Sequence, residues 1–169
     1  CRQRVDGFRE GLAESGIDYD IVQEVDGQGL KERALKVAQD ALTAHPDVNV
    51  IFGINDDSTT GGMAAYRAAG LDEESLVAIG FGLEGTVGRA ALLGKTTYRA
   101  ALGMFPEFVG ASLVDAAVAV AGGKVLPAHY ETPTRMVTLD NFDQFYRPED
   151  DDYALRLDAV RALMLQTVQ

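Results

Sequence analysis

The chain has 169 residues, of which 47% are hydrophobic and 24% charged, a composition that fits one globular domain with a sizeable core. Fifteen basic against 26 acidic residues give a formal net charge of -11, which argues against nucleic acid or an anionic membrane as the main partner, because both attract clustered Lys and Arg. The only cysteine is Cys1, so the sequence excludes an internal disulfide and any cysteine-based metal site.

The amino-terminal part of the chain predicts a helix, a strand and a second helix. Residues 2–16 repeat apolar side chains at helical spacing and end at a glycine, which is typical of a helix. Residues 19–25 alternate and predict a strand, and 26–29 predict a turn. Residues 30–44 have an amphipathic pattern that predicts the second helix.

Residues 48–62 combine a predicted buried strand with the start of a helix. Its apolar run 50–54 is typical of a strand buried on both faces, and helix N-cap residues, Asn55 and Asp56 among them, follow directly. In open α/β folds, ligands bind at the carboxyl ends of the strands. Asn55 therefore either only caps the next helix or also points at a ligand, and both alternatives stay open.

The same order of elements repeats further along the chain. Residues 76–81 predict a second buried strand, 86–93 a short helix and 96–102 a further strand. Short connections in a βαβαβ alternation imply an α/β fold in which a parallel sheet carries helices on both faces.

The carboxyl-terminal part is less regular. Residues 108–121 predict a very apolar helix, 135–139 a strand and 141–146 a short helix. Acidic residues near 148–152 suit the positive end of a helix dipole and predict the start of a terminal helix. The apolar stripe of that helix would be Tyr153, Leu157, Val160, Met164 and Val168.

Four segments resemble the ribose-type periplasmic sugar-binding proteins, whose fold is shared by the ligand domains of lactose-repressor-type regulators. They are Arg-Val-Asp-Gly-Phe at 4–8, Leu-Thr-Ala-His-Pro-Asp-Val at 42–48, Phe-Gly-Ile-Asn-Asp at 52–56 and Val-Ala-Ile-Gly-Phe at 77–81, in the family's order and spacing. The resemblance covers residues 2–146. It implies two α/β lobes joined by hinge strands, with a small polar ligand in the cleft between them.

The resemblance also implies how the chain divides. Residues 2–103 would be most of the second lobe, 104–139 the hinge crossings with a first-lobe helix, and 140–169 a C-terminal helical extension outside the family pattern. The first lobe would be mostly missing, so we expect a fragment. Its missing lobe or a second copy would cover the exposed helix 106–121.

The resemblance assigns candidate ligand contacts to several side chains. Arg4 matches a guanidinium contact, Asn55 an amide that donates and accepts, and Phe81 an aromatic that packs on a sugar ring. Arg4 is alternatively a solvated helix residue and Phe81 a plain core aromatic. The full set of candidates is Arg4, Asn55, Phe81, Asp56, Glu84, Gln28 and Met104.

Three departures from the family pattern concern the ligand. Gly82 replaces a carboxylate, Met104 replaces a hinge glutamine, and the turn at 26–29 lacks a second aromatic ring. Glu84 can restore the carboxylate, and Gln28 can add a polar contact. These departures argue against ribose in particular, and a different pentose, a polyol or a less polar small molecule matches the pattern equally well.

The resemblance favours a solute-binding protein of the bacterial periplasm or another extracytoplasmic site, which presents a small sugar or polyol to an ABC-type permease. The alternative is the ligand-sensing effector domain of a lactose-repressor-type regulator or a receptor. An enzyme is not expected: Asp56 and Asp57 lack a companion lysine or third acid for Mg²⁺, and no phosphate-binding or nucleophile motif occurs. No cofactor, metal or nucleic acid is expected for this fragment.

Overall fold

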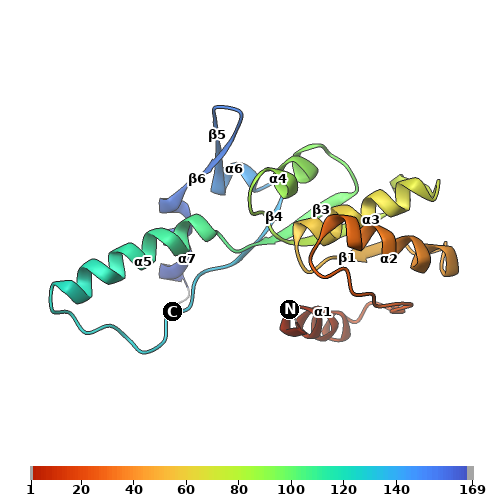
Figure 1. The fold of residues 1–169 in the computed structure, drawn as a ribbon. Coiled ribbons are helices and arrows are strands. Elements are labelled where there is room, and N and C mark those ends of the chain that lie inside the picture. The colour runs from red at the N-terminus through yellow and green to blue at the C-terminus, as the bar shows by residue number, and fades with distance from the viewer. Residues whose placement is uncertain (1, 167–169) are drawn as a thin grey trace.

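The computed structural model describes residues 2–166 (Figure 1). A four-stranded sheet in the order β1-β2-β3-β4 lies at the centre, and β5 and β6 form a separate hairpin. The strands are β1 (Val50–Phe52), β2 (Val77–Gly82), β3 (Tyr98–Gly103), β4 (Arg135–Thr138), β5 (Tyr146–Glu149) and β6 (Asp152–Leu155). The helices are α1 (Arg2–Ser15), α2 (Lys31–Ala44), α3 (Asp56–Ala68), the 3-10 turn η1 (Glu73–Ser75), α4 (Thr86–Leu93), α5 (Pro106–Ala121), α6 (Phe142–Phe145) and α7 (Leu157–Gln166).

The first three strands run parallel, as the sequence predicts. Phe52 of β1 lies opposite Ile79 of β2, and Ile79 lies opposite Ala100 of β3. The predicted strand 135–139 is confirmed as β4, which pairs antiparallel with β3 at the edge of the sheet. The carboxyl ends of β1, β2 and β3 consequently emerge at one edge.

Helices cover both faces of the sheet at β1. A Cβ added to Gly62 of α3 would lie 3.0 Å from Ile51, so Ile51 packs against α3. The ring of the next residue, Phe52, stacks on Phe8 of α1, with the centroids 4.2 Å apart and the planes 3° from parallel. Because successive side chains of a strand point to opposite faces, α3 and α1 lie on opposite sides of β1.

A cluster of buried aromatic rings ties the start of α5 to the C-terminal segment. The centroids of Phe105 and Phe145 are 5.4 Å apart, and those of Phe142 and Tyr146 are 4.8 Å apart. All four side chains are almost completely buried. The residues after 140 therefore share the core of the described chain, although they lie outside the resembling segments.

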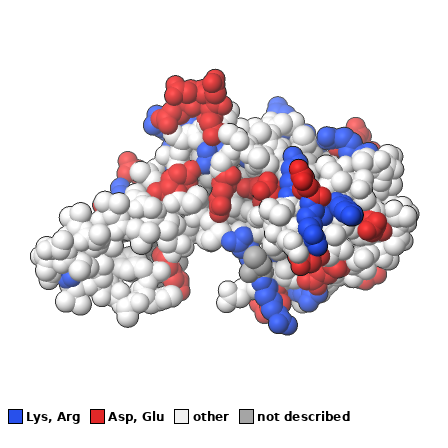
Figure 2. Space-filling model, viewed as in Figure 1, with Lys and Arg blue, Asp and Glu red and all other residues white. Residues whose placement is uncertain are grey.

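Beyond its first turn, α5 exposes apolar side chains. Phe108 is buried, but Leu113, Val114 and Val118 are 66%, 63% and 68% exposed. Figure 1 shows α5 projecting away from the sheet, and Figure 2 shows a largely uncharged surface over it. Within residues 2–166, no helix combines the length and apolar character needed to cross a bilayer.

The predicted strand at residues 19–25 is wrong. Among the described residues no strand pairs with this segment, and Tyr19, Ile21 and Val25 are each more than 40% exposed. An alternating pattern forms a strand only when a neighbour takes up its backbone hydrogen bonds.

The predicted helix start at residues 148–152 is also wrong. These residues form the β5–β6 hairpin, in which Asp150 takes a left-handed backbone conformation with φ 49°. Aspartate tolerates this conformation in turns, and Leu155 at the end of β6 is buried. The terminal helix instead begins at Leu157 and buries Val160, while Tyr153 of the predicted stripe lies in β6. Val168, the last residue of that stripe, lies outside the described residues.

A buried acid joins α3, β3 and the loop after β2. The carboxylate of Asp56 accepts a hydrogen bond from the Tyr98 hydroxyl at 2.5 Å and another from the backbone N–H of Glu84 at 3.1 Å. A Cβ added to Gly88 would lie 2.3 Å from Asp56 Cγ, so α4 packs tightly on this carboxylate. Burial raises the pKa of Asp56, although the bond from Tyr98 opposes the shift.

Because α2 and α3 approach each other closely at Gly61, we expect the added methyl group of an alanine there to lower the stability of the fold. A Cβ at Gly61 would lie 2.4 Å from the Lys31 carbonyl oxygen and 2.8 Å from the Ala34 Cβ. We expect Gly61→Ala to lower the free energy of unfolding by about 1–3 kcal/mol, because overpacking outweighs the gain in helix propensity. Gly110→Ala is the control, since a Cβ there meets nothing within 4 Å. Urea denaturation checks both; a Gly61→Ala protein as stable as the parent would contradict the packing.

The buried carboxyl of Asp56 predicts a pH dependence of stability. A raised folded pKa means that the folded state binds the proton more tightly, so this group stabilises the fold below its unfolded pKa of about 3.9. That contribution is lost as the pH rises through the folded pKa. The stability of the parent relative to Asp56→Asn should therefore fall as the pH rises from about 4, and then level off. Denaturant titrations at several pH values test this, with Asp57→Asn as control; a difference that is constant or rises with pH would refute it.

Candidate ligand-binding site

The ends of three parallel strands meet around Arg4. From α1, its Nη1 donates to the carbonyl oxygen of Ile54 at 2.6 Å, just after β1. Its Nη2 contacts the sulfur of Met104 at 3.2 Å, just after β3. The guanidinium carbon lies 4.1 Å from the centroid of the Phe81 ring at the end of β2. Three of the predicted site residues, Arg4, Phe81 and Met104, are thus brought together, and the ring of Phe81 is half-buried against Arg4.

The environment of Arg4 leaves donors for a further partner. A guanidinium carries several N–H groups in a planar fork, and the two bonds within the described residues use one N–H on each terminal nitrogen. The face of the Phe81 ring attracts the cation without consuming an N–H. The side chain is therefore held in place while part of its hydrogen-bonding capacity remains.

Asn55 is the N-cap of α3, which confirms one of the two predicted roles. Its Oδ1 accepts from the backbone N–H of Ser58 at 2.9 Å, and its Nδ2 donates to the carbonyl oxygen of Gly29 at 3.0 Å. The amide thereby pins the turn at 26–29 against the end of β1. Loss of such a cap costs about 0.5–2 kcal/mol, so Asn55→Ala would affect folding as well as any ligand.

The turn that Asn55 holds also carries Gln28. The backbone N–H of Gln28 donates to Asp26 Oδ1 at 2.9 Å, and the residue has φ 53°. Its side chain is exposed. Gln28 therefore lies on the exposed turn that Asn55 holds beside the end of β1. Among the described residues, no hydrogen bond joins it to Arg4 or Phe81.

Asp56 does not offer its carboxylate to the strand-end edge, which corrects its place among the ligand contacts. The side chain is only 6% exposed, and both oxygens accept hydrogen bonds from within the domain. Tyr98, which supplies one of them, was not expected to matter, and a single tyrosine at a strand start gives no sequence signal of such a role. Asp56 instead fixes the loop after β2, because its carboxylate accepts the hydrogen bond from the Glu84 backbone N–H.

Glu84 lies close to the position where the family pattern lacks a carboxylate. A Cβ built on Gly82 would be 3.4 Å from Glu84 Cγ and 3.6 Å from its Cδ. The loop reaches this arrangement through left-handed backbone at Gly82, with φ 125°, and at Leu83, with φ 54°. Since Glu84 is exposed, its carboxylate occupies solvent-facing space beside Gly82.

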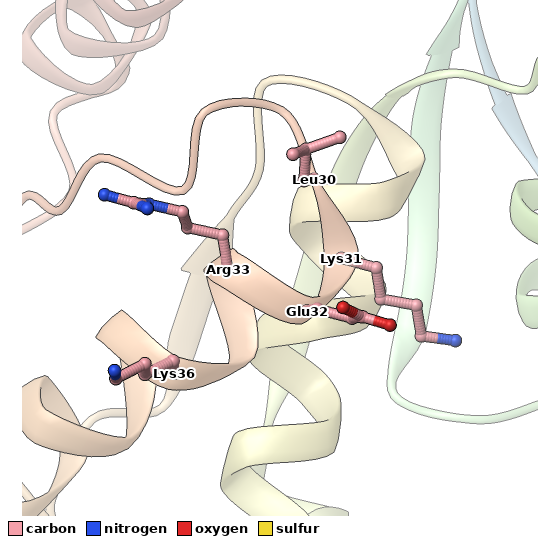
Figure 3. A pocket seen from close by; sticks show the side chains of 5 residues that line it. All are labelled: Leu30, Lys31, Glu32, Arg33 and Lys36. Carbon is pink, nitrogen blue, oxygen red and sulfur yellow. The ribbon is translucent and has the colours of Figure 1, made fainter.

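The hollow drawn in Figure 3 is not part of this cluster. It is lined by the first turns of α2, namely Leu30, Lys31, Glu32, Arg33 and Lys36. Figure 3 shows that these side chains diverge from one another. A site for a small molecule needs convergent polar groups, so this hollow is a shallow feature of the surface. Among residues 2–166, no cluster of His, Cys, Asp and Glu is arranged to hold a metal ion.

Comparison with known proteins reveals relatives that bind small solutes. The ribose import binding protein of Escherichia coli K12 is 29% identical over 137 residues, which cover 81% of this chain and 44% of that protein. The ribose import binding protein of Bacillus subtilis is 26% identical over 137 residues, covering 81% and 42%. The chain thus spans less than half the length of these curated relatives.

Two solved structures that resemble this chain are also of solute-binding proteins, and the chain again covers less than half of each. The Caulobacter myo-inositol binding protein bound to myo-inositol is 29% identical, with a TM-score of 0.72 over 83% of this chain and 48% of that one. An ABC transporter solute binding protein from Agrobacterium vitis with bound D-fucose is 26% identical, with a TM-score of 0.71 over 83% and 47%. The family model described as periplasmic binding protein domain matches residues 1–125. Because this match covers most of the 169 residues, the chain belongs to the periplasmic binding protein domain family.

Proposed function

We propose that this chain is part of a solute-binding protein that encloses a small sugar or polyol between two lobes and presents it to an ABC-type importer. The observation that carries the proposal is the meeting of Arg4 with Phe81 at the common edge of three parallel strands. The names of the relatives, which refer to ribose, D-fucose and myo-inositol, support this class of ligand.

The strand-end edge supplies the groups that a polyhydroxylated ligand needs. Hydroxyls both donate and accept, so they match a guanidinium with spare N–H groups, an amide and a carboxylate. In the proposed site Arg4 and Asn55 donate, Glu84 accepts in place of the carboxylate missing at Gly82, and Phe81 provides an apolar surface. Gln28 closes the rim.

Met104 makes this wall less polar, because a thioether is only a weak acceptor. A buried ligand hydroxyl without a partner costs about 1–3 kcal/mol. The proposed ligand is therefore a small sugar or polyol, and a polyol, a different pentose or a less polar molecule suits this wall at least as well as ribose.

In the proposed two-lobe protein, the described sheet forms one wall of the cleft. Residues 2–103 are most of the second lobe, 104–139 cross the hinge and include a helix of the first lobe, and 140–169 are an extension. The neighbouring antiparallel strands β3 and β4 support this division, since two hinge crossings would run side by side in that way. The other wall would come from the remainder of the first lobe.

The proposed location is the bacterial periplasm or another extracytoplasmic site, where the partner would be the ABC-type permease. Membership of the periplasmic binding protein domain family supports this location. Closure of the lobes around the ligand would create the surface that the permease binds.

The proposed site predicts a specific loss of affinity. In the complete two-lobe protein, Arg4→Met should weaken binding of the preferred member of a panel of ribose, D-fucose and myo-inositol by at least about tenfold, because charge-assisted hydrogen bonds are lost. Arg9→Met is the control, since Arg9 lies on the same helix and pairs with Glu24 at the surface. Titration calorimetry measures both. Equal affinity of Arg4→Met and the parent for the preferred ligand would contradict the proposal.

The apolar face of α5 predicts association of the isolated chain. We expect the 169-residue protein to self-associate through this face, because in the proposed two-lobe protein the remainder of the first lobe would cover it. Val118→Glu should shift the protein toward the monomer, since Val118 is 68% exposed on α5. Val87→Glu, at an exposed apolar position on α4, is the control. Sedimentation velocity decides the matter: a parent that is monomeric at high concentration would rule out this role of α5.

A further inference from the structure

Arg89 of α4 is a buried cation with partners from several parts of the chain. Its side chain is only 4% exposed. Nε donates to the carbonyl oxygen of Leu83 at 3.2 Å, and Nη1 donates to the carbonyl oxygen of Tyr153 at 2.7 Å. The guanidinium carbon also lies 4.8 Å from the centroid of the Tyr146 ring. Arg89 therefore joins the loop after β2 to both strands of the C-terminal hairpin.

Two carboxylates neutralise this buried charge, and they come from different elements. Glu107, in the first turn of α5, accepts from Arg89 Nη2 at 2.6 Å. Asp152, the first residue of β6, has an oxygen 3.6 Å from Nη1. Both acids are partly exposed, at 41% and 39%. A buried arginine requires such partners, since an unpaired charge in the interior is costly.

The C-terminal segment also reaches α5 beyond this network. Arg161 of α7 lies 3.9 Å from Asp115, about two and a half turns beyond the start of α5. The aromatic cluster of Phe105, Phe142 and Phe145 packs beneath the first turn of the same helix. Figure 1 shows the hairpin and α6 between α4 and the start of α5, while α7 crosses α5, which it contacts. Residues 142–166 thus contact both the sheet domain and the projecting helix.

We infer that Arg89 is a positioning residue through which the C-terminal hairpin braces α5 and limits its angle to the sheet in the ligand-free protein. The guanidinium of Arg89 donates to Tyr153 of the hairpin and to Glu107 of α5. It also donates to Leu83 in the loop after β2, so one side chain links all three segments. Under the proposed function, on which this consequence rests, the angle of α5 is the angle between the two lobes. The hairpin, which lies outside the residues matched by the family model, would set how far the cleft opens.

The brace is tested by the distance between α2 and α5 in the 169-residue chain without any ligand, so the result does not depend on sugar binding. Spin labels go on cysteines introduced at two exposed positions, Lys36 of α2 and Ala117 of α5, with Cys1 replaced by serine and unlabelled chain added in excess. Double electron–electron resonance should give a narrow distance distribution for the parent. Glu107→Gln combined with Asp152→Asn should broaden it at least about twofold, because the buried charge then loses both acids.

Glu149→Gln is the matched control, since it removes the same charge from the same hairpin but breaks only the exposed pair with Arg147. It should leave the distribution unchanged. The single variants Glu107→Gln and Asp152→Asn guard against loss of folding, which far-ultraviolet circular dichroism reports. A double variant as narrow as the parent, a control as broad as the double variant, or unfolding of both single variants would overturn the brace.

Discussion

One guanidinium joins three strand ends that lie far apart in the sequence. Arg4 donates to the peptide oxygen of Ile54, contacts the sulfur of Met104 and covers the ring of Phe81. Parallel pairing makes this possible, because it delivers the carboxyl ends of β1, β2 and β3 to one edge. The helix that carries Arg4 has no buried residue of its own, so these contacts and the stack of Phe8 on Phe52 position it.

The strands and helices of the sheet domain were predictable because their signals are local. Apolar runs at 50–54 and 76–81, each followed by a polar or glycine-rich loop, are enough to indicate parallel strands. The expected burial of the first run on both faces is wrong, because β1 has no fully buried residue and Val50 is 46% exposed. Two further errors arose where the outcome depends on partners distant in the chain. Residues 19–25 alternate but find no neighbouring strand among residues 2–166, and residues 148–155 pair with each other rather than starting a helix.

The candidate site was predictable in its location but not in its details. A family resemblance pointed to Arg4, Asn55 and Phe81, and the structure places Arg4 against Phe81. Adjacent polar residues nevertheless differ in direction: Asn55 lies at the helix cap, while Asp56 turns inward to Tyr98. Sequence alone cannot separate them, because a helix start rotates successive side chains by about 100° and only the packing decides which one is buried.

The central claim is that the strand-end edge around Arg4 is one wall of a ligand cleft. The most direct test is the structure of the complete protein with a bound sugar or polyol from the panel of ribose, D-fucose and myo-inositol. We expect a ligand hydroxyl within hydrogen-bond distance of the Arg4 guanidinium and ligand carbon against the Phe81 ring. A ligand bound elsewhere, with the Arg4 and Phe81 pair closed over by other residues of the protein, would contradict it.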